Sequence, residues 1–246
     1  MNSHALIAAL VLPDACRVDR RVPKKLLAEH AAFGAEDRKA ILERVDELAW
    51  LYACKPGNLG VPAYRDETRE YLEIAVLRLR ARDDDGRLLE LVHRSVPYPV
   101  VLLAEQGGAV SLSLAHKRWS LGEAGRVVLE GGVVTVRWDA TAVLAPAQAA
   151  ALAWRRAESM LALYQGWMDA VFALLAEGIT GRFALPLTAE AAALRRQALA
   201  EREVLLGEIA RRTAEAERET QMAQLVALNE EVRGLRARLV EAESRL

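Results

Sequence analysis

The chain has 246 residues, of which 52% are hydrophobic and 27% are charged. This composition is sufficient for a packed core and excludes a chain that is disordered throughout. The formal net charge of −1 argues against a protein whose whole surface binds nucleic acid, although a local basic patch is compatible with it.

The cysteines and the N-terminal segment favour a cytoplasmic protein that is not inserted in a membrane. Cys16 and Cys54 lie far apart and form no CxxC pair, so neither a disulfide framework nor a zinc site is implied. The apolar run over residues 5–12 is too short to cross a bilayer and has no cationic segment before it. We expect a buried strand or helix there, and a signal peptide is the less favoured alternative.

A basic segment follows, with the sequence CRVDRRVPKK. Pro23 predicts an extended entry into a helix over residues 24–32. The cations of this segment are Arg17, Arg20, Arg21, Lys24 and Lys25. They form one candidate nucleic-acid-binding surface.

Residues 35–53 have the spacing of an amphipathic helix. Apolar side chains recur there at steps of three and four residues, at Ile41, Val45, Leu48 and Tyr52. The following KPGNLGVPAY contains two glycines and two prolines, which predicts that the helix ends in a loop.

The sheet is predicted within residues 70–138. The second half of REYLEIAVLRLRAR alternates apolar residues with arginines, as in a strand with one face in the core. A turn at 83–86 and a short helix over 87–94 precede a central strand at 99–105. A turn at 106–108 leads to a strand over 110–115, and a last pair at 126–130 and 133–138 is joined at Gly131 and Gly132. We expect about five strands, mostly antiparallel.

The remainder of the chain predicts helices. Residues 147–177 carry a helical stripe of large apolar side chains, and GITGRFALPL interrupts it. From Thr188 to Leu246 there is no proline, and Thr188 is a suitable first residue for one long helix.

The end of this helix has a heptad pattern. Its apolar positions step alternately by three and four residues: Leu225, Leu228, Val232, Leu235, Leu239, Ala242 and Leu246. Flanking positions pair Glu231 with Arg236 and Arg238 with Glu243, which favours parallel self-association as a homodimer. Docking on a partner, or folding back on the chain's own domain, are the alternatives.

The sequence contains no recognisable catalytic signature. GxSxG, HExxH, GxGxxG and GxxxxGK[ST] are all missing, and the four histidines are scattered, so we assign no catalytic residue, metal or cofactor. A restriction-type nuclease would need a (D/E)xK step, which neither Glu105, Glu70 nor Glu73 provides. The aspartates at 83–85 lie in a predicted turn. Whether the protein is an enzyme stays open, and a divergent nuclease is the least favoured hypothesis.

His116, Lys117 and Arg118 end a predicted strand. Such a tripeptide could bind phosphate oxygens, and with Arg94 and residues 17–25 it could form a small basic face. The alternative is a solvated strand end.

Three stretches, RRVPKK, ILERVDELAWLYACKPGNLGVP and VPYPVVLLAEQGG…VSLSLAHKR, resemble the bacterial family catalogued as domain of unknown function 4391. The resemblance covers roughly residues 15–180. It implies a gene neighbourhood with helicases and DNA methyltransferases in restriction-like, anti-phage systems, but no catalytic residues. Lys24, His116, Lys117 and Arg118 match recurrent polar positions of that family.

The sequence therefore predicts an α+β domain over 1–145, a helix and linker over 146–186, and a long helix with a coiled-coil end over 187–246. The hypothesis for function is a non-enzymatic adaptor subunit of a restriction-like defence system. It would bind a helicase or DNA methyltransferase through the α+β domain and oligomerise through its tail. A nucleic-acid-binding module is the alternative.

Overall fold

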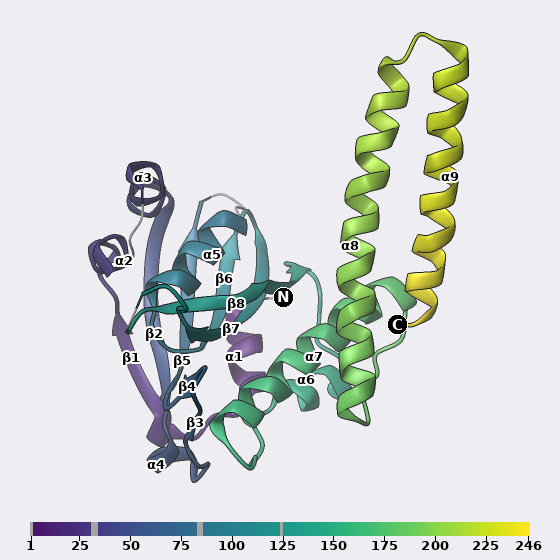
Figure 1. The fold of residues 1–246 in the computed structure, drawn as a ribbon. Helices are drawn as coiled ribbons and strands as arrows, with labels where there is room; N and C mark the ends of the chain where they lie inside the picture. Colours follow the sequence, from purple (N-terminus) through teal and green to yellow (C-terminus); the bar gives the residue numbers. More distant parts are fainter. Residues whose placement is uncertain (1, 31–33, 83–85, 124) are drawn as a thin grey trace. The chain divides into compact units, whose positions relative to one another are not determined.

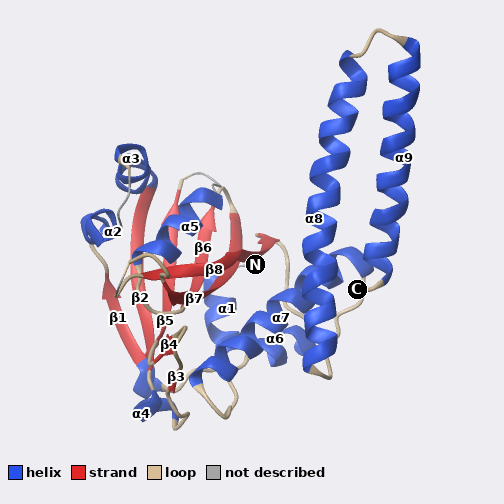
Figure 2. Cartoon of the chain, in the orientation of Figure 1, coloured by secondary structure: helices blue, strands red, loops and turns tan. Residues whose placement is uncertain are grey.

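The structure is a computed structural model, and it describes residues 2–30, 34–82, 86–123 and 125–246. The chain divides into two compact units, Met1–Val171 and Phe172–Leu246. All strands belong to the first unit, and the second is helical (Figures 1 and 2). The predicted α+β class is confirmed. None of the helices in the described ranges is long and apolar enough to cross a membrane.

The first unit is built on a six-stranded sheet with the order β1-β2-β5-β6-β7-β8. The strands are β1 (Arg17–Arg21), β2 (Val45–Cys54), β5 (Ile74–Ala81), β6 (Val100–Gln106), β7 (Ala109–Trp119) and β8 (Val127–Asp139). Every neighbouring pair is antiparallel except β5 and β6, which are parallel. A parallel pair needs a crossover, and α5 (Gly86–Ser95) supplies it. The prediction of a mostly antiparallel sheet with a central strand at 99–105 is confirmed.

Helices cover one face of the sheet with an apolar layer. These are α2 (Lys24–His30), α3 (Ala35–Arg44) and α5. Leu27, Ile41 and Leu88 pack with the strand residues Leu48 and Leu77 in one buried cluster. This layer fixes the C-terminal end of α5 over the sheet.

The remaining elements of the first unit are short or lie elsewhere on the sheet. They are α1 (Ser3–Leu10), the 3₁₀ turn η1 (Asp14–Cys16), α4 (Pro56–Leu59), the two-stranded β3 (Tyr64–Arg65) and β4 (Glu70–Tyr71), α6 (Pro146–Leu152) and the first half of α7 (Met160–Thr180). The apolar run at 5–12 is therefore mainly helical. α1 contacts β6 and α6.

The prediction of a helix over 35–53 is wrong in its second half. α3 ends at Arg44, and residues 45–54 form β2, which pairs with both β1 and β5. A strand inside a sheet is buried on both faces, so its apolar residues do not alternate cleanly and can mimic helical spacing. Two register shifts between β2 and β5 also make the spacing of the inward side chains of β2 irregular.

The prediction of a separate strand pair joined at Gly131 and Gly132 is also wrong. β8 is one strand that passes through both glycines. His116 pairs with Glu130, whereas Leu114 pairs with Val134, so the glycines occupy a bulge opposite Ala115. Gly131 has φ of 73°, a conformation that favours glycine. The two glycines bend the strand instead of reversing it.

The helical predictions need two corrections. Residues 147–177 form α6 and α7, separated at 153–159, where the backbone N–H of Trp154 donates to Leu10 O at 2.8 Å. Residues 188–246 form two helices, α8 (Ala189–Arg218) and α9 (Met222–Ser244). Glu219 is extended, and its carboxylate accepts from the N–H groups of Thr220 and Gln221, both at 2.7 Å. This local hydrogen bonding interrupts the helix without glycine or proline.

Candidate functional site

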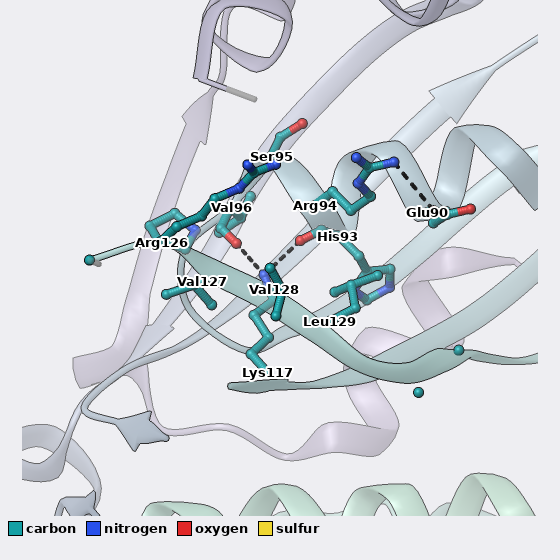
Figure 3. A pocket seen from close by; sticks show the side chains of 14 residues that line it. Glu90, His93, Arg94, Ser95, Val96, Lys117, Arg126, Val127, Val128 and Leu129 are labelled. Carbon is teal, nitrogen blue, oxygen red and sulfur yellow. Dashed lines mark hydrogen bonds and ion pairs between the residues drawn. The ribbon is translucent and has the colours of Figure 1, made fainter. Parts of the chain in front are cut away.

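A cavity of about 800 Å³ lies beside the C-terminal end of α5 in the first unit (Figure 3). Its lining comes from α5, the segment that follows it, β7, and the first half of β8 with the loop before it. The charged side chains of the lining are Glu90, Arg94, Lys117 and Arg126. Three of these four charged side chains are cationic.

Lys117 is positioned by the alternation of β7. Its side chain points to α5, and its Nζ donates to His93 O at 2.6 Å and, by a very short contact, to Val96 O. Figure 3 shows both contacts converging on the end of the lysine side chain. The last carbonyls of a helix have no partner within the helix, so Lys117 stabilises this end of α5.

The ammonium group of Lys117 is buried, with 3% of the residue exposed. Burial lowers the pKa of Lys117 to about 7. Among the described residues, no carboxylate oxygen lies within ion-pair distance of its Nζ. Within the described ranges, the partners of this ammonium group are two neutral carbonyls.

His93 lies beside Lys117 and is completely buried. Burial, with a smaller effect of the lysine charge, lowers the pKa of His93 to about 3, so its ring is neutral at physiological pH. Nε2 is 3.0 Å from Ser113 Oγ, and Nδ1 has no partner in the described part of the chain. The hydroxyl of Ser113 can donate to Nε2 or accept from it, so this contact is compatible with either tautomer of the neutral ring.

Two arginines of the lining are partly exposed. Arg94 Nη1 is 3.5 Å from Glu90 Oε1, and Arg126 Nη1 is 2.6 Å from Glu123 Oε1. Glu90 also accepts from Arg87 at 3.1 Å. Their side chains are 33% and 39% exposed, so both guanidinium groups can exchange these partners for a ligand.

The tripeptide His116-Lys117-Arg118 does not form one tip, because neighbouring residues of a strand point to opposite faces. His116 Nδ1 lies 2.6 Å from Tyr71 Oη, and its Nε2 lies 3.0 Å from Gln165 Oε1 in α7. The amide oxygen of Gln165 can only accept, so Nε2 carries the proton and Tyr71 donates to Nδ1. Arg118 donates to Trp119 O at 3.0 Å. Only Lys117 of the three lines the large cavity.

The basic segment near the N-terminus begins on an edge strand of the sheet, away from Lys117. Arg17, Arg20 and Arg21 are exposed on β1, an edge strand that three strands separate from β7. Arg17 pairs with Asp19. Lys24 Nζ donates to Leu42 O at 2.6 Å and Val45 O at 3.1 Å, and so holds α2 against the end of α3. Lys25 is exposed. The structure therefore does not bring this segment together with Lys117.

The carboxylates considered for a nuclease each lie beside a cation. Glu105 accepts from Arg80 Nε at 2.9 Å and from Ser3 Oγ. Burial opposes ionisation of Glu105, but these two hydrogen bonds bring its pKa below the ordinary value. Glu70 pairs with Arg65 at 3.1 Å and Glu73 with Lys55 at 3.2 Å. The aspartates at 83–85 lie outside the described residues. Within the described ranges, no three His, Cys, Asp or Glu side chains are arranged to hold a metal.

The predicted heptad stripe of the tail faces α8 of the same chain. Val232 and Ala242 are buried, and the partly buried positions are Leu225, Leu228, Leu235, Leu239 and Leu246. Arg202 Nε pairs with Glu243 at 2.9 Å and Arg212 Nε with Glu231 at 3.1 Å. The two helices therefore form an antiparallel hairpin, and two of the charges expected to join two copies bridge its helices.

The sequence singled out Lys117 and Arg94 but not His93 or Arg126. His93 looked like a scattered histidine, and Arg126 began a predicted strand. No spacing in the sequence relates residue 93 to residue 126, since only the crossover through α5 and the long β7–β8 pair bring them to one cavity. The sequence signals for this cavity were Lys117, in the basic tripeptide that ends β7, and Arg94.

Comparison with known proteins identifies one family. The search of curated proteins found no match, and the search of solved structures found none either. The family model described as domain of unknown function (DUF4391) matches residues 10–239, which extends the resemblance noted in the sequence beyond residue 180 into the helical hairpin. Because this match spans nearly the whole sequence, the chain belongs to the DUF4391 family.

Proposed function

We propose that the chain is a non-enzymatic adaptor subunit that works in the cytoplasm as part of a restriction-like, anti-phage system. Its partner would be a helicase or a DNA methyltransferase. The class of partner comes from the family resemblance noted in the sequence, and the docking surface comes from the geometry of the first unit.

The observation that carries this proposal is an apolar groove of about 280 Å³ on the helix-covered face of the sheet. Leu26 of α2 and Tyr98 line it and are 42% and 37% exposed. Trp50 of β2 lies at its base and stacks on Tyr98, with ring centroids 6.5 Å apart. Partly exposed aromatic residues around a pocket are typical of protein-binding hot spots.

The surroundings of the groove indicate the chemistry of the partner segment. Arg20 pairs directly with Trp50 across β1 and β2, and Lys25 is exposed on α2 beside Leu26. A segment with an apolar or aromatic anchor and flanking acidic side chains would complement this combination.

The proposal is tested by affinity purification of the full chain from its native cells, with and without nuclease treatment. We expect a helicase or DNA methyltransferase that persists after nuclease treatment. Tyr98→Ala and Leu26→Asp should each remove it. Leu121→Asp, at an apolar position that is 95% exposed and outside the groove, serves as the matched control.

Two results would contradict the adaptor proposal. One is the absence of both enzyme classes from the purified material. The other is retention of the enzyme by both groove variants, which would mean that the groove is not the docking surface.

Nucleic-acid binding is the second candidate, and the exposed arginines of the edge strand favour it. Arg20 and Arg21 are exposed on β1 and could contact phosphates. Binding of this kind should weaken steeply with salt, and the double variant Arg20→Glu/Arg21→Glu should reduce the salt dependence. A fluorescently labelled DNA duplex, titrated at several salt concentrations, measures both effects. Arg233→Glu on α9, where the side chain is 82% exposed, is the control.

Self-association through the C-terminal helix remains a proposal with a defined structural requirement. The stripe from Leu225 to Leu246 already packs on α8, so a dimer through it would have to exchange α9 between two copies. Light scattering on the purified chain measures the mass. A measured mass of twice 27.1 kDa would support the exchange of α9 between two copies, and a measured mass of 27.1 kDa would argue against it.

A further inference from the structure

We propose that the cavity beside the end of α5 binds the phosphate group of a nucleotide-sized ligand, with Lys117, Arg94 and Arg126 as the cations that hold it. This site is distinct from the apolar groove and does not depend on the adaptor proposal.

The first argument is the charge of the lining. Of its four charged side chains, Arg94, Lys117 and Arg126 are cationic and Glu90 is anionic, which gives a net charge of +2 (three minus one) when Lys117 is protonated. The chain as a whole has a net charge of −1. The cavity therefore has a local excess of positive charge that the overall composition does not predict.

The second argument is the state of Lys117. Buried charges in proteins are normally paired with an opposite charge, because removing an ion from water is costly. Lys117 has two neutral carbonyls as partners and one further N–H to donate. An anion in the cavity would supply the missing counter-charge and would favour the protonated lysine.

The third argument is an unsatisfied ring nitrogen. His93 lines the same cavity, and its Nδ1 is the buried ring nitrogen without a partner. When Ser113 donates to Nε2, Nδ1 carries the proton of the neutral ring and can donate to an anion. An acceptor that reached it would remove an unsatisfied buried polar group.

The fourth argument concerns size and shape. A volume of about 800 Å³ is within the range of small-molecule and cofactor sites, and far exceeds what a lone phosphate needs. Val96, Pro97 and Val127 provide apolar wall beside the cations. Gly125, Gly131 and Gly132 add no side chains to the lining, and a Cβ built on any of them has nothing within 4 Å. The sugar or base of a nucleotide could therefore occupy the part of the cavity next to the bound phosphate.

The site is tested by isothermal titration calorimetry on the purified full chain. The probes are inorganic pyrophosphate, a mixture of nucleoside 5′-monophosphates, and a short single-stranded DNA with and without a 5′-phosphate. We expect a dissociation constant of about 1 mM or tighter for at least one phosphate-bearing probe. Preference for the monophosphates would identify a free nucleotide as the ligand, whereas preference for the phosphorylated strand would identify a strand end.

The rim arginines provide the decisive variants. Arg94→Gln and Arg126→Gln each remove one charge-assisted hydrogen bond at a partly exposed position, so each should weaken binding about tenfold. Arg233→Gln on α9 should bind like the wild type. Lys117→Met would also leave the carbonyls of His93 and Val96 without a donor and could unfold the end of α5, so the proposal does not depend on it.

The pH dependence of sulfate binding separates this site from a nonspecific basic surface. Sulfate keeps its charge over the range used, so a change in affinity reports on the protein. The charged and titratable groups that face Lys117 are His93, Glu90 and Arg94 of α5, Arg126 before β8, and Glu70, Glu73 and Arg118 around an adjoining cavity. Burial lowers the pKa of Lys117 to about 7, so affinity should fall up to about tenfold per pH unit above about pH 7.

The proposal is overturned if the wild type binds none of the probes at about 1 mM. It is equally overturned if both arginine variants bind as tightly as the wild type, or if sulfate affinity does not change between about pH 6 and pH 9.

Discussion

Tyr164 shows how one hydroxyl group can stabilise an irregularity in the sheet. Its ring is completely buried, and its oxygen accepts from the backbone N–H of Ala115 at 2.9 Å. The same hydroxyl donates to Val100 O at 2.8 Å. Ala115 lies where the β7–β8 register shifts, so its N–H would otherwise be buried without a partner. Tyr164 thus links α7 to two strands at the bulge between Leu114 and His116.

We predict that Tyr164→Phe lowers the free energy of unfolding by about 2 kcal/mol, because the phenyl ring leaves the buried N–H of Ala115 without an acceptor. Urea unfolding of the full chain, followed by circular dichroism, measures this. Tyr98→Phe, at a residue that is 37% exposed, should change stability by less than about 0.5 kcal/mol. Equal effects of the two substitutions would show that the Tyr164 hydroxyl does not support the bulge.

Lys117 makes the stability of the first unit depend on pH. Burial lowers its pKa in the folded chain to about 7, while the unfolded chain keeps the ordinary value near 10.4. Between these values the unfolded chain binds the extra proton, so the free energy of unfolding rises with pH. Below pH 7 the full cost of burying the charge is present.

We therefore predict that the wild type gains stability relative to Lys117→Met by about 1.4 kcal/mol per pH unit between about pH 7 and pH 9. Urea titrations of both proteins across this pH range give the difference between their free energies of unfolding. The contributions of the other titrating groups cancel in this difference. A constant difference would mean that Lys117 is not desolvated in the folded chain. Phosphate or sulfate is left out of the buffer, since an anion in the cavity would raise the pKa of Lys117.

At the scale of elements, the hairpin of α8 and α9 depends on the inward face of α9. Val232 is 6% exposed and lies against α8, whereas Val226 on the same helix is 51% exposed. Burial of a valine side chain contributes about 1.5–3 kcal/mol, and a carboxylate in its place adds a desolvation cost.

We predict that Val232→Asp releases α9 from α8, whereas Val226→Asp leaves the hairpin intact. Hydrogen–deuterium exchange of residues 222–244, measured by mass spectrometry, should show at least tenfold faster exchange in the first variant only. If both variants exchange like the wild type, the stripe does not hold the two helices together.

A second example at the scale of elements is the pair Cys16 and Cys54, which lie at the ends of η1 and β2. The turn η1 and the end of β2 place the two thiols near each other, and both are buried and free. Burial raises the pKa of both thiols, most strongly that of Cys54, where the neighbouring thiol adds to it. Because the thiolate is the reactive form, this environment makes both cysteines slow to react.

We predict that neither thiol of the native chain reacts within minutes with an aromatic disulfide reagent at about pH 8, and that two thiols react after unfolding in guanidinium. The absorbance of the aromatic thiolate released from the reagent gives the number of cysteines that have reacted. Immediate reaction of the native protein would mean that η1 does not cover Cys54.

At the scale of the whole molecule, the chain divides into two compact units. The first contains the complete sheet and the apolar cluster beneath α2, α3 and α5, and the second contains the hairpin. We predict that a chain ending at Pro186 retains the fold of the first unit, since its core lies within residues 1–171. The prediction is confirmed if the truncated chain unfolds cooperatively on heating and has the same tryptophan fluorescence maximum as the full chain. Loss of cooperative unfolding would show that the first unit needs the hairpin.

The sequence by itself determined the parts of this protein that depend on local pattern. The alternation over 74–81 and the apolar run over 100–106 are strands, and the turn at Gly107 and Gly108, both with positive φ, joins β6 to β7. The heptad stripe marks the inward face of α9, and three short motifs were sufficient to identify the family. Each of these signals lies within a few residues, where backbone sterics and side-chain spacing act directly.

The tertiary structure decided what depends on distant neighbours. Residues 45–54 are a strand because β1 and β5 pair with them, and Gly131 and Gly132 form a bulge because β7 continues opposite them. Strand alternation directs Lys117 toward α5 and His116 toward α7, so the tripeptide that looked like one cluster belongs to two environments. The cavity with His93, Arg94 and Arg126 exists only because a crossover helix ends above a long hairpin. Hydrogen bonding between strands and burial act across the fold, and no spacing along the chain encodes them.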